Sequence, residues 1–594
     1  MQSRSRYGLY VVLVIGVLAI ASMLFLVRND KQETSKENNA TSQLTGQSGE
    51  SIGKSVIPST DIKAGQEPTV ETAAADPFVP VTAVDAVNQM GVGWNLGNQL
   101  DAMPDEGDWG NGIVDASVFD EVKAAGFDLV RIPVSWNDHI GAAPDYLIDT
   151  LWMDRVEEVV DWALERDMWV MLNVHHDSWK YMNLDKQSDP EESLRKFVKI
   201  WGQIAQRFSG KSEKLMLETL NEPTDIDPDK LNDLNDQIVQ LIRSSGGNNK
   251  ERLVVEPGLH TNIDETIKTF KKPSDPYVIL TVHNYDPWDY VSNWWGHVTW
   301  GTESDKTYFD DMFKRLHDKF VADGLPVIIG EFGTLGTNER HSKWVYHDYF
   351  VRTAKKYGMV SVWWDNGEHL DRLRGSWNDP VVKDIIVNAS HGIANSFVET
   401  GDLYVRQGKA ADTTFQLELN GNALTGVFNG ETPLGEEDYK LDADGAKVTI
   451  QKDYLAGMLQ DQGLGDRGQL TFRFSQGADQ IVHVHQYKDP VLKQKELVID
   501  RSGGGIVGDL GIELDYNGTE LAKLKAVEAD GQSVHTEWKD KQYVNLSDDF
   551  TFDAYRVYLK AKFANMFDKD AIITLEFWPS GVQLEVPVKV MNKK

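Results

Sequence analysis

The chain has 594 residues, of which 41% are hydrophobic, and it contains no cysteine. This length exceeds that of an ordinary single domain, and the lack of cysteine excludes disulfides, thiolate catalysis and cysteine-bound metals. The net charge of −32 argues against a nucleic-acid partner, whose phosphates require Lys and Arg, and otherwise favours solubility.

Residues 1–28 are predicted to place the rest of the chain outside the cytoplasm. A run of 21 uncharged residues that ends at Val27 is long enough to span a bilayer. Arg4 and Arg6 precede it, which favours a cytoplasmic amino terminus. The sequence Ala-Ile-Ala at 19–21 resembles a signal-peptidase site, but the apolar run continues beyond it. We therefore expect an uncleaved membrane anchor rather than a cleaved signal segment, and the protein to be extracellular in either case.

Residues 29–77 are polar and nearly lack aromatic side chains, which predicts a disordered linker. Residues 78–395 then alternate between strand-like and helix-like patterns. The predicted strands are 92–96, 127–133, 168–174, 215–220, 252–256, 277–282, 326–329 and 360–364. Apolar residues recur at helical spacing between the third and fourth strands, at Leu194, Phe197, Val198, Trp201, Ile204, Ala205 and Phe208. This alternation predicts an α/β fold, a (β/α)₈ TIM barrel.

After residue 395 the pattern changes to the alternation of period two that is typical of antiparallel strands. The segments 414–419, 470–474, 572–577 and 584–590 carry it, and 454–459 is the one helical pattern that we expect there. The sequence predicts two β-sandwich, immunoglobulin-like domains, 396–488 and 489–594, which meet at Lys488-Asp489-Pro490.

Glu222 and Glu331 are the most informative residues of the predicted barrel. Each closes a strand-like segment, and they are 109 positions apart, enough for three strand–helix units. Because the carboxyl ends of barrel strands share one face, both carboxylates should lie in the barrel mouth. Two facing carboxylates are what glycosidic bond cleavage requires, about 5–5.5 Å apart in a retaining enzyme.

Further polar and aromatic residues follow other predicted strands, namely Arg131, His175, His176, His283, Tyr285 and Trp364. A lone His or Trp is more often structural, but their joint placement at several strand ends favours an active site. Adjacent residues of a strand point to opposite faces, so His175 and His176 should not chelate one ion. The familiar zinc spacings are also missing, and we expect no metal.

Seven motifs in this order resemble glycoside hydrolase family 5, and most closely its subfamily 4. They are GVGWNLGNQLDA, AGFDLVRIPVSW, LNVHHDSW, LETLNEP, VHNYDPWDY, IIGEFG and VWWDNG, and they span about residues 91–388. One departure is Gly112 after Trp109-Gly110-Asn111, where the family often has proline. It affects a loop and leaves the chemistry untouched.

The resemblance implies roles for individual residues. Glu222 would be the general acid/base and Glu331 the nucleophile. Arg131 and Tyr285 would hold the nucleophile, and Asn221 would bind the sugar 2-hydroxyl. The remaining substrate-binding residues implied are His175, His283, Trp364, Asn95 and His176, with Trp109, Trp136 and Trp179 contacting sugars further along the cleft.

The carboxyl-terminal third resembles known modules as well. Residues 398–487 are similar to an X2-type immunoglobulin-like module, and residues 490–594 to carbohydrate-binding module family 46. Trp538 and Trp578 are the candidates for stacking on sugars, with a core position as the alternative for either one.

Together these features predict an extracellular retaining endo-β-1,4-glucanase that acts on xyloglucan, mixed-linkage glucan or amorphous cellulose. We expect it to be a monomer, to need no cofactor, and to contact the membrane through its amino-terminal segment. The alternatives are a non-catalytic glycan-binding protein of the cell surface, or an endo-β-mannanase.

Overall fold

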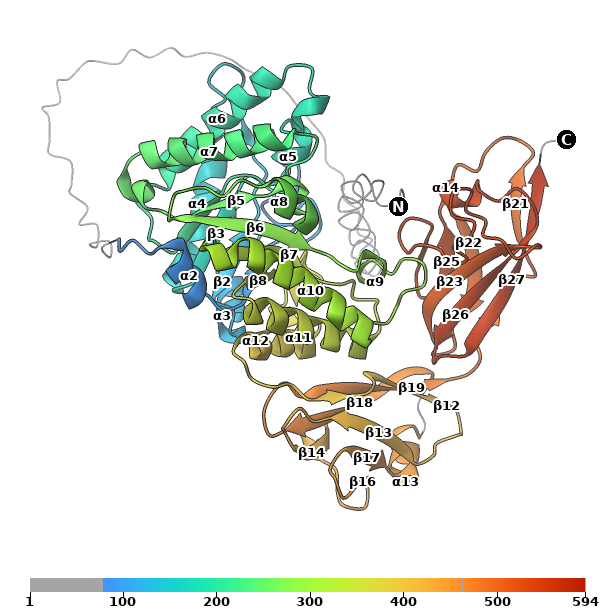
Figure 1. Cartoon of the computed structure of the whole chain (residues 1–594). Coiled ribbons are helices and arrows are strands. Elements are labelled where there is room, and N and C mark those ends of the chain that lie inside the picture. Colours follow the sequence, from blue (N-terminus) through green and yellow to red (C-terminus); the bar gives the residue numbers. More distant parts are fainter. Residues whose placement is uncertain (1–77, 461–462, 593–594) are drawn as a thin grey trace, which may run out of the picture.

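A computed structural model describes residues 78–460 and 463–592. It contains a parallel barrel followed by two units built of mainly antiparallel sheets, each with one parallel strand pair, β12–β19 or β21–β27 (Figure 1). The predicted anchor and linker lie outside the described residues. Within the described residues, no helix is both long and apolar enough to cross a membrane.

Eight parallel strands close into the predicted barrel, each paired with its neighbours in chain order. They are β1 (Gly93–Asn95), β2 (Leu129–Ile132), β3 (Trp169–Asn173), β4 (Leu215–Glu218), β5 (Val254–Pro257), β6 (Val278–Asn284), β7 (Val327–Phe332) and β8 (Val360–Trp363). Every predicted strand is confirmed, with ends that shift by at most a few residues.

Helices surround the barrel and pack on its outer face (Figure 1). Those of eight residues or more are α3 (Ser117–Ala125), α4 (Thr150–Glu165), α6 (Pro190–Arg207), α7 (Pro228–Ser244), α10 (Glu303–Lys319), α11 (Arg340–Lys356) and α12 (Pro380–Ser390). Shorter ones are α2 (Ala83–Gln89), α5 (Asp177–Lys180), α8 (Ile263–Thr269) and α9 (Trp288–Val291). The predicted helical face between the third and fourth strands is confirmed as α6. This helix begins at Pro190, and the Asp189 side chain caps it by accepting from the Glu192 backbone N–H.

The barrel interior is apolar at the bottom and polar at the top. Inward-facing residues of the lower layers form one hydrophobic cluster with α2, which closes the bottom: Leu129, Met171, Met216, Val255, Ile279, Ile328 and Val362. The next inward positions toward the carboxyl ends are polar and buried: Asn95, Arg131, Asn173, Glu218, His283 and Glu331. The strand alternation therefore brings the polar residues together under the barrel mouth.

A β-bulge turns Glu331 into this mouth. Val282 pairs with Ile329, but the next residue, His283, pairs with Glu331, so Gly330 is the extra residue. Strict alternation from the inward Ile328 would point Glu331 outward among the helices. The bulge reverses the parity, as bulges beside active sites often do. Phe332 instead faces outward and stacks on Phe350 of α11, with ring centroids 4.3 Å apart.

The chain after the barrel forms two units, each of two packed sheets. In the first, β11–β13–β17–β16 faces β12–β19–β18–β14–β15; in the second, β20–β22–β25–β24 faces β21–β27–β26–β23. Each pair of sheets encloses its own apolar core, as expected for a sandwich.

The first unit comprises β11 (Phe397–Val398), β12 (Asp402–Arg406), β13 (Thr413–Glu418), β14 (Leu424–Asn429), β15 (Thr432–Pro433), β16 (Tyr439–Leu441), β17 (Lys447–Ile450), α13 (Lys452–Met458), β18 (Gly465–Phe474) and β19 (Gln480–Tyr487). The second comprises β20 (Val491–Leu492), β21 (Leu497–Arg501), β22 (Leu510–Asp515), β23 (Glu520–Glu528), β24 (Phe550–Phe552), β25 (Arg556–Leu559), α14 (Ala561–Ala564), β26 (Ala571–Trp578) and β27 (Val582–Asn592). The four predicted strands and the predicted helix are confirmed.

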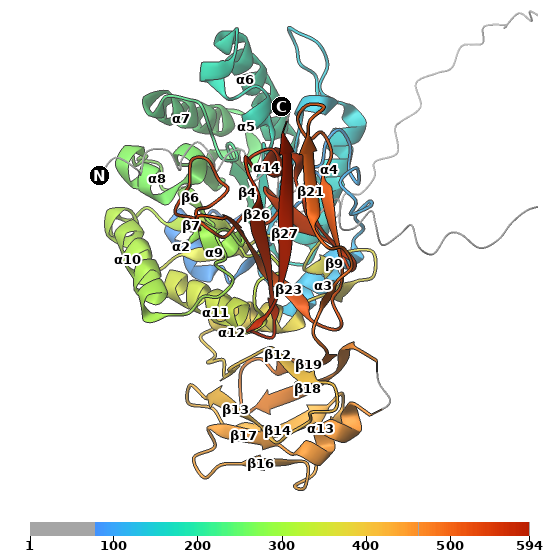
Figure 2. The ribbon, with the colours of Figure 1, turned by 90° about the vertical axis from the view of Figure 1, so that its right-hand side faces the viewer.

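The second unit lies against the barrel near the loop after β6 (Figures 1 and 2). The backbone N–H of Trp295 donates to Asn545 Oδ1 at 3.1 Å, and the Trp295 ring contacts those of His535 and Trp538. Leu335, from the loop after β7, packs on the core of this unit. The carboxyl-terminal unit therefore contacts the barrel at its mouth.

Candidate active site

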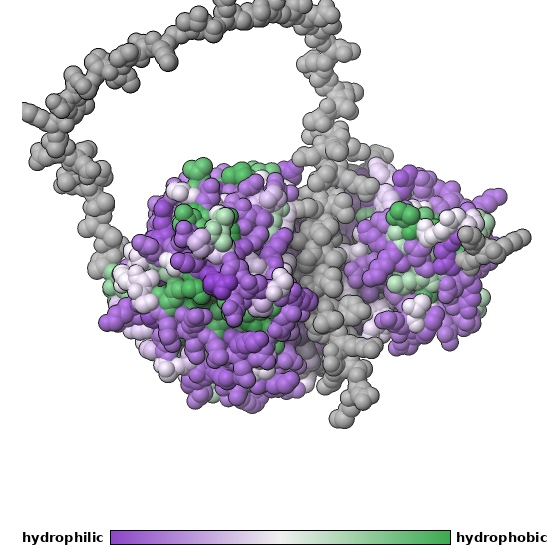
Figure 3. All heavy atoms as spheres, turned by 90° about the horizontal axis from the view of Figure 1, so that it is seen from above, coloured by the Kyte–Doolittle hydropathy of each residue, from purple (hydrophilic) through white to green (hydrophobic). Residues whose placement is uncertain are grey.

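One cavity opens at the carboxyl ends of the barrel strands. Its lining includes Asn98, Trp109, His175, His176, Asn221, Glu222, Tyr285, Val291, Glu331, Leu335, Trp364, Asn366, Glu368 and His369. These residues come from loops that follow different strands, which is how barrel enzymes assemble a site. The surface seen in Figure 3 is mainly hydrophilic, with hydrophobic residues gathered in a few patches.

Glu222 lies just beyond β4 in a backbone conformation that is rare for its residue type. Its φ of 38° is in the left-handed region, and Pro223 follows it. Such strain persists only where the surroundings impose it, and it clusters at functional sites. The Glu222 carboxyl group is 2.9 Å from His283 Nδ1. The strained turn thus holds this carboxyl group against the inward residue of β6.

Glu331 is held by two donors. Arg131 Nη1 donates to its Oε1 at 2.7 Å, and the Tyr285 hydroxyl donates to its Oε2 at 3.0 Å. Burial and the nearby carboxylates raise the pKa of Tyr285 well above 10, so its hydroxyl stays protonated and can donate. Both contacts stabilise the ionised form of Glu331.

The two carboxyl groups are close and unequal. One oxygen of Glu222, one of Glu331 and a ring nitrogen of His283 lie within 4.8 Å of one another. Burial raises the pKa of Glu222 well above its usual value, and the charge of Glu331 adds to the rise. Burial also raises the pKa of Glu331, but Arg131 and Tyr285 oppose this and limit it to about 7. A proton shared by the pair therefore resides on Glu222.

Arg131 uses all five of its N–H groups. Nε donates to Glu218, Nη1 to Asn95 and Glu331, and Nη2 to Glu218 and Asn221. Both Arg131 and Asn95 are wholly buried beneath the cavity. They can therefore act on a ligand only through Glu331 and Asn221, which line the cavity.

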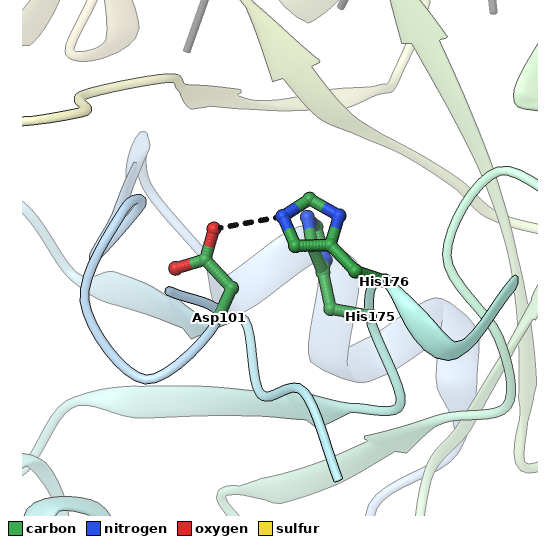
Figure 4. Close-up of side chains that lie close together, drawn as sticks. All are labelled: Asp101, His175 and His176. Atoms are coloured by element: carbon green, nitrogen blue, oxygen red, sulfur yellow. Dashed lines mark ion pairs between the residues drawn. The ribbon is translucent and has the colours of Figure 1, made fainter. Parts of the chain in front are cut away.

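His175 and His176 follow β3 and line the cavity. Figure 4 shows the His176 ring directed at Asp101, with Nε2 and Oδ2 3.3 Å apart. His175 and His176 do not face opposite ways as adjacent residues of a strand would, because β3 ends before them and His176 has helical backbone angles. The two rings meet edge to face with centroids 4.5 Å apart.

Two groups in the described part of the chain have ligand atoms close enough together to hold a metal ion. One is Asp101 with His175 and His176, and the other is Glu222 with His283 and Glu331. The second group has the arrangement that an acid–nucleophile pair needs without a metal. The expectation that no metal takes part remains a prediction.

Aromatic rings flank the carboxyl pair. Trp364 lies parallel to His175, with ring centroids 6.0 Å apart. Its edge rests on Gly97, where a Cβ atom would come within 2.7 Å of the ring, so only glycine leaves room for this position. Trp109 and Trp179 pack on His176, with centroids 5.3 and 4.4 Å away. A sugar ring needs such apolar faces next to the reacting groups.

Known proteins with this arrangement identify the family. The sequence model "Cellulase (glycosyl hydrolase family 5)" matches residues 87–370. Endoglucanase B of Paenibacillus lautus is 32% identical over 86% of this chain and 92% of its own length. The chain belongs to glycosyl hydrolase family 5. The model "Carbohydrate binding domain X2" matches residues 399–484.

Solved structures of this family share the whole described architecture. A tri-modular subfamily 4 endo-β-1,4-glucanase from Bacillus licheniformis is 46% identical, with a TM-score of 0.80 over 86% of this chain and all of that chain. The full-length tri-modular endo-β-1,4-glucanase B from Bacillus halodurans is 31% identical, with a TM-score of 0.75 over the same shares.

One sequence prediction for the family 5 hydrolase is wrong. Trp136 does not reach the cleft, because its side chain is 0% exposed and lies in the barrel core. Its Nε1 donates to the Asn173 carbonyl, which leaves no polar group for a sugar. Being bulky and apolar, it fills space between β3 and the outer layer.

The tryptophans of the carboxyl-terminal unit lie at different places. Trp538 is half-buried beside Trp295, with ring centroids 6.1 Å apart, at the rim of the hydrolase barrel. Trp578 ends β26 and pairs with Glu520, whose carboxylate is 3.9 Å from His485 of the middle unit. Of the two, only Trp538 contacts a residue of the barrel in these ring contacts, namely Trp295.

Sequence reasoning missed several residues of the site in this family 5 hydrolase. Asp101, Asn98, Asn366 and Glu368 belong to loops whose course it could not predict. Glu218 and Asn173 carried a readable signal, because each is a polar residue at an inward position of a strand that is otherwise apolar.

Proposed function

We propose that this glycoside hydrolase is an extracellular, retaining endo-β-1,4-glucanase that cleaves plant β-glucans. The observation that carries the proposal is the unequal pair: Glu222 and Glu331 are buried together, and Arg131 is bonded to only one of them. The names of the relatives, endoglucanases among them, support the same substrate class.

In the first step Glu331 attacks the anomeric carbon while the bond to the leaving oxygen breaks. The proton of Glu222 moves to that oxygen, so the released sugar departs neutral and Glu222 becomes a carboxylate. An ester then joins the remaining sugar to Glu331. Arg131 and Tyr285 keep Glu331 ionised for the attack, and burial keeps Glu222 protonated.

In the second step Glu222 takes a proton from water as the water oxygen attacks the anomeric carbon. Glu331 leaves as a carboxylate, and the two displacements restore the starting configuration. Neutral His283 beside both carboxyl groups can hold the Glu222 carboxylate between the steps. Burial lowers the pKa of His283 well below 6.5 and excludes a competing positive charge.

Each side chain can bind the substrate through the hydrogen-bonding groups that it does not use within the protein. Arg131 occupies the Oδ1 atom of Asn221, so its amide N–H groups are available for the sugar 2-hydroxyl. His175 and Trp364 complete the subsite at the cleaved bond, with Trp364 as the platform under the ring, and His283 acts through Glu222. His176, Trp109 and Trp179 extend the same wall.

The appended units suit a long polymer. We place the barrel domain at 78–395, the middle module at 396–488 and the carbohydrate-binding module at 489–594. Val291 and Leu335 line the cavity, and Leu335 also packs on the last module, so that module would prolong the cleft. A related structure in complex with cellotetraose shows that a Bacillus licheniformis relative binds a glucan chain.

The amino-terminal segment supports an extracellular location. Its apolar run and the two preceding arginines would export the chain and keep it at the membrane, with residues 29–77 as the tether. The β-glucan substrate would then be met outside the cell.

Reducing-sugar release by the protein beginning at Ala74 tests the proposal. The polymers are xyloglucan, barley mixed-linkage glucan, carboxymethyl cellulose and mannan, each also treated with the Glu331→Ala protein. We expect release from the glucans that is lost in Glu331→Ala. Preferential release from mannan would favour a mannanase, and binding without release would favour a non-catalytic glycan-binding protein.

A further inference from the structure

A third glutamate lies directly beneath the reacting pair. Glu218 is the last residue of β4, faces the barrel interior, and is 0% exposed. It does not line the cavity, so no substrate atom can reach it. An ionised carboxylate in such a place is costly unless it is fully paired.

Glu218 is paired with the same guanidinium that holds the nucleophile. Its Oε2 accepts from Arg131 Nε at 2.9 Å, and its Oε1 accepts from Nη2 at 3.3 Å. This two-point contact fixes the plane and rotation of the guanidinium. As a result Nη1 faces Glu331, and the second hydrogen of Nη2 faces Asn221.

Glu218 also reaches the substrate side through Asn173. The Oδ1 atom of Asn173 accepts from the Val134 backbone N–H, so its Nδ2 must face Glu218 and His175. Nδ2 is 2.8 Å from Glu218 Oε2 and 3.0 Å from His175 Nδ1. Since Nδ2 can only donate, His175 Nδ1 accepts, and the proton of the neutral ring resides on Nε2.

The negative charge of Glu218 also affects the protonation of the buried cluster. Arg131 carries one positive charge, and Glu218 and Glu331 carry two negative charges when Glu222 is protonated. A second proton loss would leave three carboxylates around one guanidinium, which burial opposes. The negative charge of Glu218 therefore helps to keep the proton on Glu222.

We propose that Glu218 is a positioning residue for hydrolysis, which holds Arg131 against Glu331 and Asn221 and, through Asn173, selects the His175 tautomer that donates to the sugar. This inference rests on the proposed function. Glu218 acts through these neighbours and never touches the substrate.

The test is the pH profile of kcat/KM for the Glu218→Gln protein. Facing Glu331 are Arg131 of β2, Glu218 and Glu222 of the β4 side, and His283 and Tyr285 of the β6 side. Removing the Glu218 charge makes ionisation easier for both Glu331 and Glu222. Both limbs of the profile should therefore move to lower pH, and kcat should fall at least about tenfold because a positioning contact for the transition state is lost.

Glu256→Gln is the matched control. Glu256 is a buried glutamate on the neighbouring strand β5, next to the inward-facing Val255, so it faces the outer helices, and the charged groups that act on it are Asp236, Asp275 and Arg243. Its substitution should leave kcat/KM and both limbs of the activity profile unchanged. A purely structural role for Glu218 would lower the melting temperature without moving the limbs.

The Glu218→Asp protein distinguishes the effect of the negative charge from the effect of the side-chain length. It keeps the carboxylate, so the limbs should stay at the wild-type pH values while the shortened side chain lowers kcat. If Glu218→Gln does not unfold cooperatively, Glu218→Asp decides the matter. Wild-type kcat in Glu218→Asp, or wild-type limbs in folded Glu218→Gln, would overturn the inference. Loss of all Glu331-dependent hydrolysis in the unmodified protein would instead overturn the proposed function.

Discussion

Four buried glutamates of this barrel have the same side chain and different chemistry. Arg131 and Tyr285 donate to Glu331 and stabilise its ionised form, whereas burial favours the protonated form of Glu222. Glu218 forms an ion pair with Arg131. Glu256 has one carboxyl oxygen without a partner among the described residues, and burial raises its pKa to about 8. Neighbours rather than residue type decide each state.

The acid role of Glu222 predicts a substrate-dependent defect in Glu222→Gln. Protonation matters most for a poor leaving group, so hydrolysis of β-glucan should fall about 10²–10⁴-fold. An aryl β-cellobioside with an acidic phenol needs no proton to depart, so formation of the glycosyl-enzyme from it should persist. Burst kinetics with this aryl substrate measure the step. An equal loss on both substrates would contradict the assignment.

Glu256 predicts a stability that depends on pH. The folded pKa of about 8 exceeds the usual value of 4.5, so the folded state binds its proton more tightly than the unfolded state. The resulting contribution is fully present below pH ~4.5 and is lost as the pH rises through about 8, at up to about 1.4 kcal/mol per pH unit. Glu256→Gln should remove this dependence and raise the melting temperature at pH 9 but not at pH 4. If the melting temperatures of the two proteins changed with pH in the same way, the prediction would be contradicted.

At the scale of single elements, the bulge in β7 places Glu331 in the active site. Gly330 lies under Thr281 and His283, where a Cβ atom would come within 2.7 Å of Thr281 Oγ1 and 3.0 Å of His283 Nε2. Only glycine allows β6 and β7 to approach this closely while Glu331 turns inward. The bulge thereby links Glu331, the proposed nucleophile, to the histidine that contacts Glu222.

Gly330→Ala should therefore damage catalysis more than folding. The added methyl group displaces His283 and the inward turn of Glu331, and we expect kcat/KM to fall about 10–100-fold. Gly202→Ala is the control. Gly202 lies in helix α6, and a Cβ atom added there would have no atom within 4 Å. The control should keep full activity and unfold at an equal or higher temperature. Equal activity of both variants would show that the bulge is dispensable.

The positions of the strands could be predicted from sequence, but the β-bulge in β7 and the orientation of Trp136 could not. Strands such as 168–174 read as long apolar runs because parallel barrel strands are buried on both faces. The bulge at Gly330 depends on the pairing of β7 with β6, in which Glu331 pairs with His283, 48 residues earlier, and periodicity does not record this. Trp136 was wrongly placed in the cleft because its distance from a strand end says nothing of which way it turns.

At the scale of the whole molecule, the last module packs against loops at the mouth of the barrel. Trp295 of the barrel contacts His535 and Trp538 of that module, and Lys541 lies over the same ring at 5.7 Å. Leu335 joins the cavity wall to the module core. Neither contact could be predicted from sequence, because the surfaces come from distant parts of the chain: Trp295 and its partner Asn545 are 250 residues apart.

Trp538→Ala should weaken the use of long polymers only. Loss of an aromatic contact near the rim is worth roughly 1 kcal/mol, which corresponds to about a fivefold rise in KM for a polymeric glucan. Hydrolysis of a short aryl cellobioside should not change. Trp578→Ala is the control, because Trp578 lies at the end of β26 next to the middle module. An equal effect of the two variants on polymer KM would contradict a role for the rim.

The most direct test of the catalytic assignment is to trap the covalent intermediate. In a 2-deoxy-2-fluoro-β-cellobiosyl fluoride, the fluorine at C2 slows both steps because it destabilises their oxocarbenium-like transition states. Fluoride departs readily from the anomeric carbon, so the glycosyl-enzyme still forms but is hydrolysed slowly. Peptide mapping by mass spectrometry should locate one cellobiosyl group on Glu331, and the Glu331→Ala protein should remain unlabelled. A label on any other residue, or none on an active enzyme, would contradict the account.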